Sequence, residues 1–338
     1  ANSHVKKGAI KEAQSLYYAI LKAFPKNKRA LQGLIDLNAP KNSSVKQGLP
    51  QELITQLINL YNIGSLEEVV KQSQSLIKQN PEAWVVWNIM GAANKALGRV
   101  DEAFEAFKKV TEINSKYAEG FNNLGVALKD QGKPDEALAS YKKAFSLKPD
   151  SVETCNNIGN ILKSQSKLDE ALAFYEKALL LKPDYAEAHY NMGNVLQDQG
   201  QFNEAVASYE KALAFNSNYA EALINMGNIF KEQGRFDKAL SAYAKILSFK
   251  PDYAEAHYNI GISLRSQGRL EEAIDAFKKA ISLKPDYAEA YNNYGLSLAD
   301  QGKSDEAISV FNKVLSFKPE FASAYFNIGV TLADQSKV

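Results

Sequence analysis

The stretch AEGFNNLGVALKDQGKPDEALASYKKAFSLKPDS, residues 118–151, decides the fold. Its apolar residues fall three and four apart in two runs, as they do on one face of a helix: Phe121, Leu124 and Leu128, then Ala137, Tyr141, Ala144 and Leu147. Gly132 separates the runs, and Pro149 stops the second because proline lacks the amide hydrogen that a helix interior needs. The stretch therefore predicts two helices, which we name helix A and helix B.

One glycine of helix A returns at a fixed interval. It recurs every 34 residues, at Gly91, Gly125, Gly159, Gly193, Gly227, Gly261, Gly295 and Gly329. Such spacing means that one unit is copied along the chain, which predicts an all-α solenoid with a long, regular surface. A glycine within a helix costs about 1 kcal/mol relative to alanine. This register therefore needs a cause, and we predict a close approach of helices A and B.

The turns carry matching signals. Glycine ends helix A where a left-handed residue is favoured, and serine replaces it in two copies: Gly98, Gly132, Gly200, Gly234, Gly268 and Gly302, with Ser166 and Ser336. Acidic pairs open helix B, where the helix dipole favours negative charge: Asp135/Glu136, Asp169/Glu170, Glu271/Glu272 and Asp305/Glu306. Asp184 and Glu187 have the spacing of a capping box, so we expect Asp184 and its equivalents to cap helix A.

The 34-residue pattern as a whole resembles the tetratricopeptide repeat (TPR). In that repeat Leu, Ile or Met precedes the glycine inside helix A, a second glycine ends helix A, and helix B contributes Ala, an aromatic residue and Ala before a final Pro. The resemblance covers nearly the whole chain and implies a right-handed superhelical solenoid of antiparallel helix pairs. We expect eight full repeats, which start at residues 50, 84, 118, 152, 186, 220, 254 and 288. The first is degenerate, with Leu57 in place of the glycine, and residues 322–338 form a terminal half repeat.

The N-terminal part follows the same pattern in a different phase. We predict a partial repeat as a cap over residues 1–39, a linker rich in turn formers over 40–50, and the repeat array over 51–338. Residues 1–48 hold 9 Lys and Arg against 2 Asp and Glu, which we interpret as a solvated basic cap.

Composition points away from nucleic acid and membranes. The formal net charge is only +1, and no run approaches the 18 apolar residues typical of a membrane span. The single cysteine, Cys155, excludes a disulfide within the chain and occupies a packing position of helix A. A lone buried thiol fits a reducing compartment, and we expect a cytoplasmic protein.

The sequence carries no pattern of an enzyme or a metal site. It contains no CxxC, HExxH, GxSxG or P-loop lysine pattern. His189 and His257 share one packing position two repeats apart, which is too far for both to ligate one metal ion. We therefore expect no catalytic residue, no metal and no cofactor.

Asparagine forms a second register, two residues before the glycine: Asn123, Asn157, Asn191, Asn225, Asn259, Asn293 and Asn327. Asparagine is a mediocre helix former, so its repetition also needs a cause. The TPR resemblance implies that this part of helix A faces a concave groove. A carboxamide both donates and accepts hydrogen bonds, so this asparagine ladder could bind the main chain of an extended peptide.

Further residues favour a peptide ligand, and one alternative competes with it. The same side of helix A carries a second row at Asn160, Asn194 and Asn228, and the aromatic residues Tyr190 and Tyr258. Amides and tyrosines offer adaptable bonding and flat contact area. The alternative is that the ladder only bonds adjacent repeats to each other.

The ladder resembles the TPR superhelix of O-linked N-acetylglucosamine transferases and similar bacterial arrays. There, matching asparagines hold the main chain of a protein substrate, but the sugar-transfer domain is not part of this sequence. TPR proteins that bind chaperone tails use a carboxylate clamp of lysine, arginine and asparagine. Here the clamp lysine positions hold Asn122, Asn156, Tyr190 and Ile224, so we do not expect that function.

Three hypotheses follow. The first is a non-catalytic protein-interaction module that binds extended peptides and recruits substrates for a larger protein. The second is a scaffold that self-associates through the last helix A, which presents Tyr325, Ile328 and Leu332 without a helix B. The third is the TPR part of a transferase, which the gene sequence past Val338 would decide.

Overall fold

The computed structural model describes residues 49–335. The predicted cap, most of the predicted linker and Ser336 lie outside the described residues. Every element of the described part is an α-helix: α3 (Gln51–Asn62), α4 (Leu66–Gln79), α5 (Trp84–Ala96), α6 (Val100–Ile113), α7 (Ala118–Asp130), α8 (Pro134–Leu147), α9 (Val152–Ser164), α10 (Leu168–Leu181), α11 (Ala186–Asp198), α12 (Phe202–Phe215), α13 (Ala220–Glu232), α14 (Phe236–Phe249), α15 (Ala254–Ser266), α16 (Leu270–Leu283), α17 (Ala288–Asp300), α18 (Ser304–Phe317) and α19 (Ala322–Gln335).

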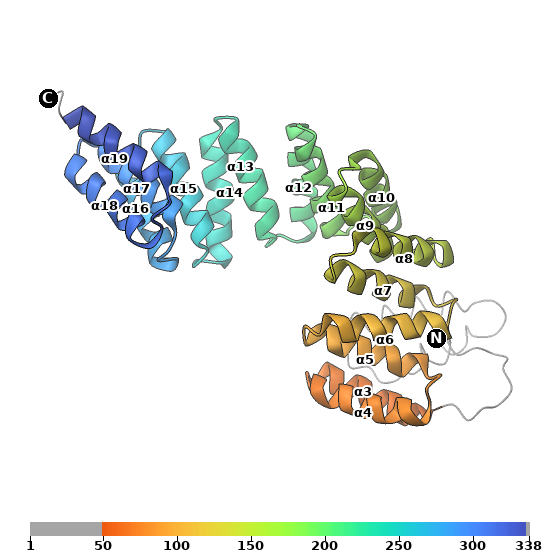
Figure 1. Cartoon of the computed structure of the whole chain (residues 1–338). Helices are drawn as coiled ribbons and strands as arrows, with labels where there is room; N and C mark the ends of the chain where they lie inside the picture. The colour runs from red at the N-terminus through yellow and green to blue at the C-terminus, as the bar shows by residue number, and fades with distance from the viewer. Residues whose placement is uncertain (1–48, 336–338) are drawn as a thin grey trace.

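The helices stack as pairs along an elongated, curved array (Figure 1). Each helix A packs against the helix B that follows it, and each helix B packs against the next helix A. The array runs from α3 and α4, drawn in orange, to α19, drawn in blue. Contacts thus join neighbours in the sequence, as a repeat solenoid requires, and the predicted all-α solenoid of helix pairs is confirmed.

The recurring glycine of helix A makes room for an aromatic ring of helix B. A Cβ atom on Gly125 would lie 2.6 Å from Cε1 of Tyr141, and the six other full repeats with the glycine repeat this contact. The rings are buried to at least 98%: Phe107, Tyr141, Tyr175, Tyr209, Tyr243, Phe277 and Phe311. At Gly329 in α19 nothing lies within 4 Å of the added atom. The close approach predicted between helices A and B is therefore an approach of the glycine backbone to an aromatic ring.

The turn after helix A behaves as predicted. The six glycines predicted to end helix A have φ between 70° and 77°, Gly64 after α3 has φ 80°, and Ser166 adopts the same left-handed conformation at 59°. Asp or Glu pairs occupy the first turn of helix B at the predicted places, for example Asp135 and Glu136 in α8.

The predicted capping box is wrong. Helix α11 has Tyr185, not Asp184, as its N-cap residue, and no side chain accepts a capping hydrogen bond there. Within residues 49–335 only Ser151 caps a helix A by its side chain, since its Oγ accepts from the amide of Thr154 at 3.3 Å. The glutamate of each box is therefore free to bind elsewhere.

Candidate functional site

The ladder asparagines lie on helix A of successive repeats, from α7 to α19. Six are half-buried, and Asn259 is buried with 5% of its surface exposed. We name the surface formed by the ladder and the second row, Asn160, Asn194 and Asn228, the asparagine face.

The side-chain amide of most ladder residues donates to the preceding repeat. Nδ2 reaches Oδ1 of the asparagine 35 positions earlier at 2.8–3.1 Å in four cases: Asn123 to Asn88, Asn157 to Asn122, Asn191 to Asn156, and Asn327 to Asn292. These bonds support the alternative role between adjacent repeats. They occupy only the nitrogen, however, and among the described residues Oδ1 of these four ladder asparagines accepts no hydrogen bond.

Where the preceding repeat lacks that asparagine, the ladder residue finds another partner. The position 35 residues before Asn225 is Tyr190, and Asn225 donates to Oδ1 of Asn194 at 2.8 Å. The position 35 residues before Asn293 is Tyr258, and Asn293 donates to the Glu289 carbonyl oxygen at 2.9 Å. The residue before the ladder in one repeat therefore decides how the ladder side chain of the next repeat is held.

The last case, Asn259, reverses the pattern. Its predecessor is Ile224, which offers no acceptor, and its own Oδ1 accepts from Nζ of Lys231 at 2.9 Å. Asn259 is thus the one ladder residue within residues 49–335 that uses its oxygen and leaves its amide nitrogen without a partner.

In the second row the oxygen of each carboxamide is hydrogen-bonded, whereas in most of the ladder it is the nitrogen. Tyr175 donates its hydroxyl to Oδ1 of Asn160 at 2.8 Å, and two repeats copy this bond at the same length: Tyr209 to Asn194 and Tyr243 to Asn228. Each hydroxyl is protonated at neutral pH, and burial raises the pKa of all three tyrosines further. Nδ2 of each second-row asparagine donates to no atom in the described part of the chain.

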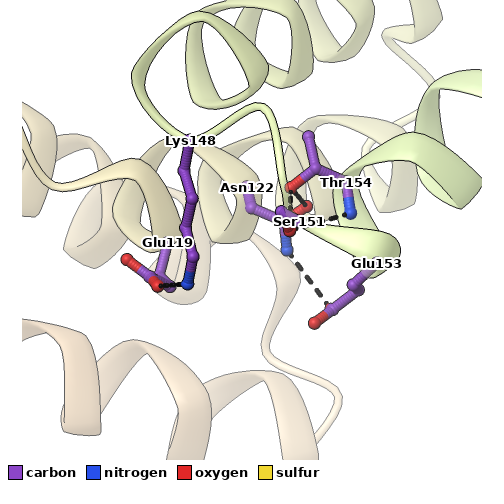
Figure 2. A network of polar contacts seen from close by, with 6 residues as sticks. All are labelled: Glu119, Asn122, Lys148, Ser151, Glu153 and Thr154. Atoms are coloured by element: carbon purple, nitrogen blue, oxygen red, sulfur yellow. Dashed lines mark hydrogen bonds and ion pairs between the residues drawn. The ribbon is translucent and has the colours of Figure 1, made fainter. Parts of the chain in front are cut away.

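Figure 2 shows how one junction is tied together. Asn122 donates to Glu153 at 3.2 Å, and its Oδ1 accepts from the Thr154 hydroxyl at 3.3 Å. Beside it, Lys148 pairs with Glu119 at 2.7 Å. The next junction repeats the amide-to-glutamate bond from Asn156 to Glu187 at 2.9 Å. Two of the glutamates expected in capping boxes, Glu153 and Glu187, therefore hold the asparagine that supports the ladder.

Tyr190 and Tyr258 pack between repeats. Their rings lie 4.7 Å from Tyr219 and 4.9 Å from Tyr287, which are the N-cap residues of the next helix A. Both are half-buried, so part of each ring stays on the surface. The tyrosine that precedes five of the helices A, at Tyr117, Tyr185, Tyr219, Tyr253 and Tyr287, was visible in the sequence, but its place in the junction was not predicted.

His189 and His257 serve the packing of helix A. Nε2 lies 3.0 Å from the Pro183 carbonyl oxygen in His189 and 2.9 Å from that of Pro251 in His257. Trp87, in the same register, donates to Pro81 at 2.8 Å. No group of His, Cys, Asp and Glu in the described residues could hold a metal ion. None of the described helices is long and apolar enough to cross a bilayer.

Comparisons with solved structures give the fold. The protein pilF of Pseudomonas aeruginosa is 20% identical over 65% of this chain and 98% of its own, with a TM-score of 0.56. A TPR protein of Parabacteroides merdae is 20% identical over 79% and 99%, with a TM-score of 0.51. YrrB, described as a TPR protein with an unusual peptide-binding site, is 30% identical over 56% and 97%, with a TM-score of 0.47. A search of curated proteins finds no match.

The sequence family gives a more specific result. A profile described as TPR repeat matches six segments, 91–132, 159–200, 193–234, 227–264, 263–302 and 295–336. A second, described as tetratricopeptide repeat, matches 118–151. Arrays of this fold are in general non-catalytic scaffolds for protein interaction. The chain belongs to the tetratricopeptide repeat family.

Proposed function

We propose that the array is a non-catalytic module that binds an extended segment of another protein along its asparagine face. The observation that carries this proposal is that the ladder has free carbonyl oxygens where the second row has free amide nitrogens. In the repeats of Asn157 and Asn191, the ladder offers a free carbonyl oxygen, and Asn160 and Asn194 offer a free amide one helical turn later. Each residue of a peptide main chain has one N–H donor and one C=O acceptor to match them.

The bonds inside the protein favour this use. Because one end of each carboxamide is already held by a neighbour, its other end is fixed before a ligand arrives, and less side-chain entropy is lost on binding. A single hydrogen bond contributes only about 1 kcal/mol net. Useful affinity therefore requires a row of such pairs, which the 34-residue copying supplies.

The second row allows a sharp test. Replacing Asn160, Asn194 and Asn228 by Asp keeps the oxygen that holds each tyrosine hydroxyl but removes the free amide. A matched control places the same three charges off the face, at the exposed Asn203, Asn216 and Asn218. The probes are peptides selected on the wild-type protein from a random library of blocked chains of about 12 residues, about 40 Å when extended.

We expect the second-row triple variant to bind the selected peptides at least tenfold more weakly, which is about 1.4 kcal/mol. The control triple should bind as the wild type does, and circular dichroism should show equal helicity in all three proteins. If the second-row variant keeps full affinity, the asparagine face does not bind the peptide. An alanine triple at Asn191, Asn225 and Asn259 is less informative, because it also cuts bonds between repeats.

Recruitment of a substrate for a larger protein, as in the O-linked N-acetylglucosamine transferases, remains part of this proposal. So does a cytoplasmic location. The gene sequence past Val338 tests the first, because a transferase domain there would make the array its recruiting part. Microscopy of the tagged full-length protein tests the second.

A second candidate function, self-association, rests on α19. Tyr325 and Leu332 are 58% and 50% exposed, and the neighbouring Phe326 is 71% exposed, whereas Ile328, which was expected with them, is half-buried against the core. Gly329 has open space where other repeats hold an aromatic ring. Apolar surface of this kind can bind a second copy of the chain. Light scattering over a range of concentrations tests this: a dimer that Leu332→Lys abolishes would support it, and a strict monomer would contradict it.

A further inference from the structure

The asparagine face contains one cationic position that sets it apart from a uniform ladder. Helix A carries Lys or Arg at one register of the repeat, at Lys95, Lys129, Lys163, Lys231 and Arg265. In three of these repeats the next helix A carries an aspartate 35 positions later, at Asp130, Asp198 and Asp300, and two of these aspartates form an ion pair with the cation. Lys163 pairs with Asp198 at 3.3 Å, and Arg265 pairs with Asp300 at 2.8 Å.

Lys231 has no such aspartate. The position 35 residues later is Ser266, and no carboxylate of the described residues lies within 4.0 Å of its ammonium group. Burial lowers the pKa of Lys231, which the nearby charges of Glu232 and Glu255 partly oppose. A half-buried cation without a paired carboxylate is costly, and a bound anion lowers that cost.

The groups around Lys231 are arranged for an anion. Its Nζ donates to Oδ1 of Asn259 at 2.9 Å and to Oδ1 of Asn228 at 3.3 Å. An ammonium group has three N–H donors, so one remains. Because both oxygens turn toward the lysine, the amide nitrogens of Asn228 and Asn259 keep their N–H groups free, and neither nitrogen is sealed from solvent.

We propose that Lys231, Asn228 and Asn259 form a subsite for the side-chain carboxylate of an aspartate or glutamate in the bound peptide. Three donor groups and one positive charge match a group with one negative charge and two acceptor oxygens. A phosphate group, with nearly two negative charges, would leave charge uncompensated beside a single lysine. The inference rests on the proposed function, and its positive charge comes from Lys231, since the clamp lysine position of that repeat holds Ile224.

The sequence itself supplies matched variants. Ser266→Asp places the missing aspartate opposite Lys231, as Asp198 stands opposite Lys163. The new carboxylate should pair with Lys231 and prevent a peptide carboxylate from binding there. Lys231→Met removes the charge and keeps the long apolar stem. Ser164→Asp adds the same charge at the equivalent position of another repeat, opposite Lys129, and serves as the control.

The experiment uses the blocked peptide library described above, so that only side chains can provide a carboxylate. We expect peptides selected on the wild type to share an Asp or Glu at one position. Replacing that residue by Asn or Gln should weaken binding about tenfold, and the same loss should appear with Lys231→Met and with Ser266→Asp. Ser164→Asp should bind as the wild type does, and the peptide change should have no further effect in Lys231→Met.

Three results would overturn the inference. If peptides bind the wild type without an acidic position, or keep their affinity for Lys231→Met and Ser266→Asp, the subsite is wrong although the proposed function stands. If neutral peptides with a free C-terminus depend on Lys231 while acidic blocked peptides do not, the site takes a chain terminus instead of a side chain. If no peptide binds the wild type, the proposed function itself fails and takes the subsite with it.

Discussion

The junction between α9 and α11 and the junction between α13 and α15 are built on the same core but end in different surfaces. In the first, Asn191 donates to Asn156, and the ladder offers an oxygen to solvent. In the second, Ile224 stands in place of that asparagine, Lys231 binds Asn259, and the ladder offers an amide beside a positive charge. One residue that does not itself belong to the ladder thus changes what the ladder presents.

The comparison separates two layers of the repeat. The glycine and the aromatic ring between helices A and B return in every full repeat from Gly91 onward, and they fix the stacking. The residues between successive helices A vary from junction to junction, and they fix the chemistry of the asparagine face.

The largest effect is expected in the shared core. An alanine Cβ at Gly193 would lie 2.6 Å from Tyr209, and at Gly227 it would lie 2.5 Å from Tyr243. Overpacking costs about 1–3 kcal/mol, of which the better helix propensity of alanine returns about 1 kcal/mol. We therefore expect Gly193→Ala and Gly227→Ala to lower the free energy of unfolding by similar amounts, measured by denaturant titration.

Gly329→Ala is the control for the core, because nothing surrounds that position. There the change should stabilise α19 by about 0.5–1 kcal/mol, seen as slower hydrogen exchange of its amides. Unequal losses at Gly193 and Gly227, or a loss at Gly329, would contradict the view that the two junctions share one core.

A comparable effect is expected when the first junction is converted toward the second. Asn156 is 1% exposed, donates to Glu187 at 2.9 Å, and accepts from Asn191 at 3.0 Å. In Asn156→Ile both partners lose their bond, and each can reach solvent in part. We expect a loss of about 1–2 kcal/mol in the free energy of unfolding. An unchanged stability would mean that these bonds do not hold the junction.

Much of this architecture could be predicted from the sequence, and the failures have physical causes. Spacing and turn glycines predicted the helix pairs because they reflect local backbone chemistry. The capping box failed because the loop tyrosine takes the N-cap position, which places Asp184 one residue before it. The ladder was visible as a register, but which end of each amide is occupied depends on the preceding repeat, as at Ile224 and Lys231. The cap over residues 1–39 stays a prediction.

The smallest effect is a titration in the second junction. Burial lowers the pKa of Lys231 below the ordinary lysine value, so the folded protein releases this proton before the unfolded chain does. Stability from this group therefore rises with pH between the folded and unfolded pKa values and is lower below both. In Ser266→Asp the new charge should raise the pKa, which NMR of the lysine side chain can follow. A pKa that does not rise would contradict the predicted pairing of the two side chains.

The central claim is that the asparagine face binds the main chain of an extended peptide, and a backbone scan of a selected peptide tests it most directly. Each peptide bond is N-methylated in turn, which removes one N–H donor, and a second series replaces each side chain by alanine. We expect methylation at each of several spaced positions to weaken binding about fivefold, while alanine weakens binding mainly at the acidic residue. A flat methylation series with affinity spread over the side chains would contradict it.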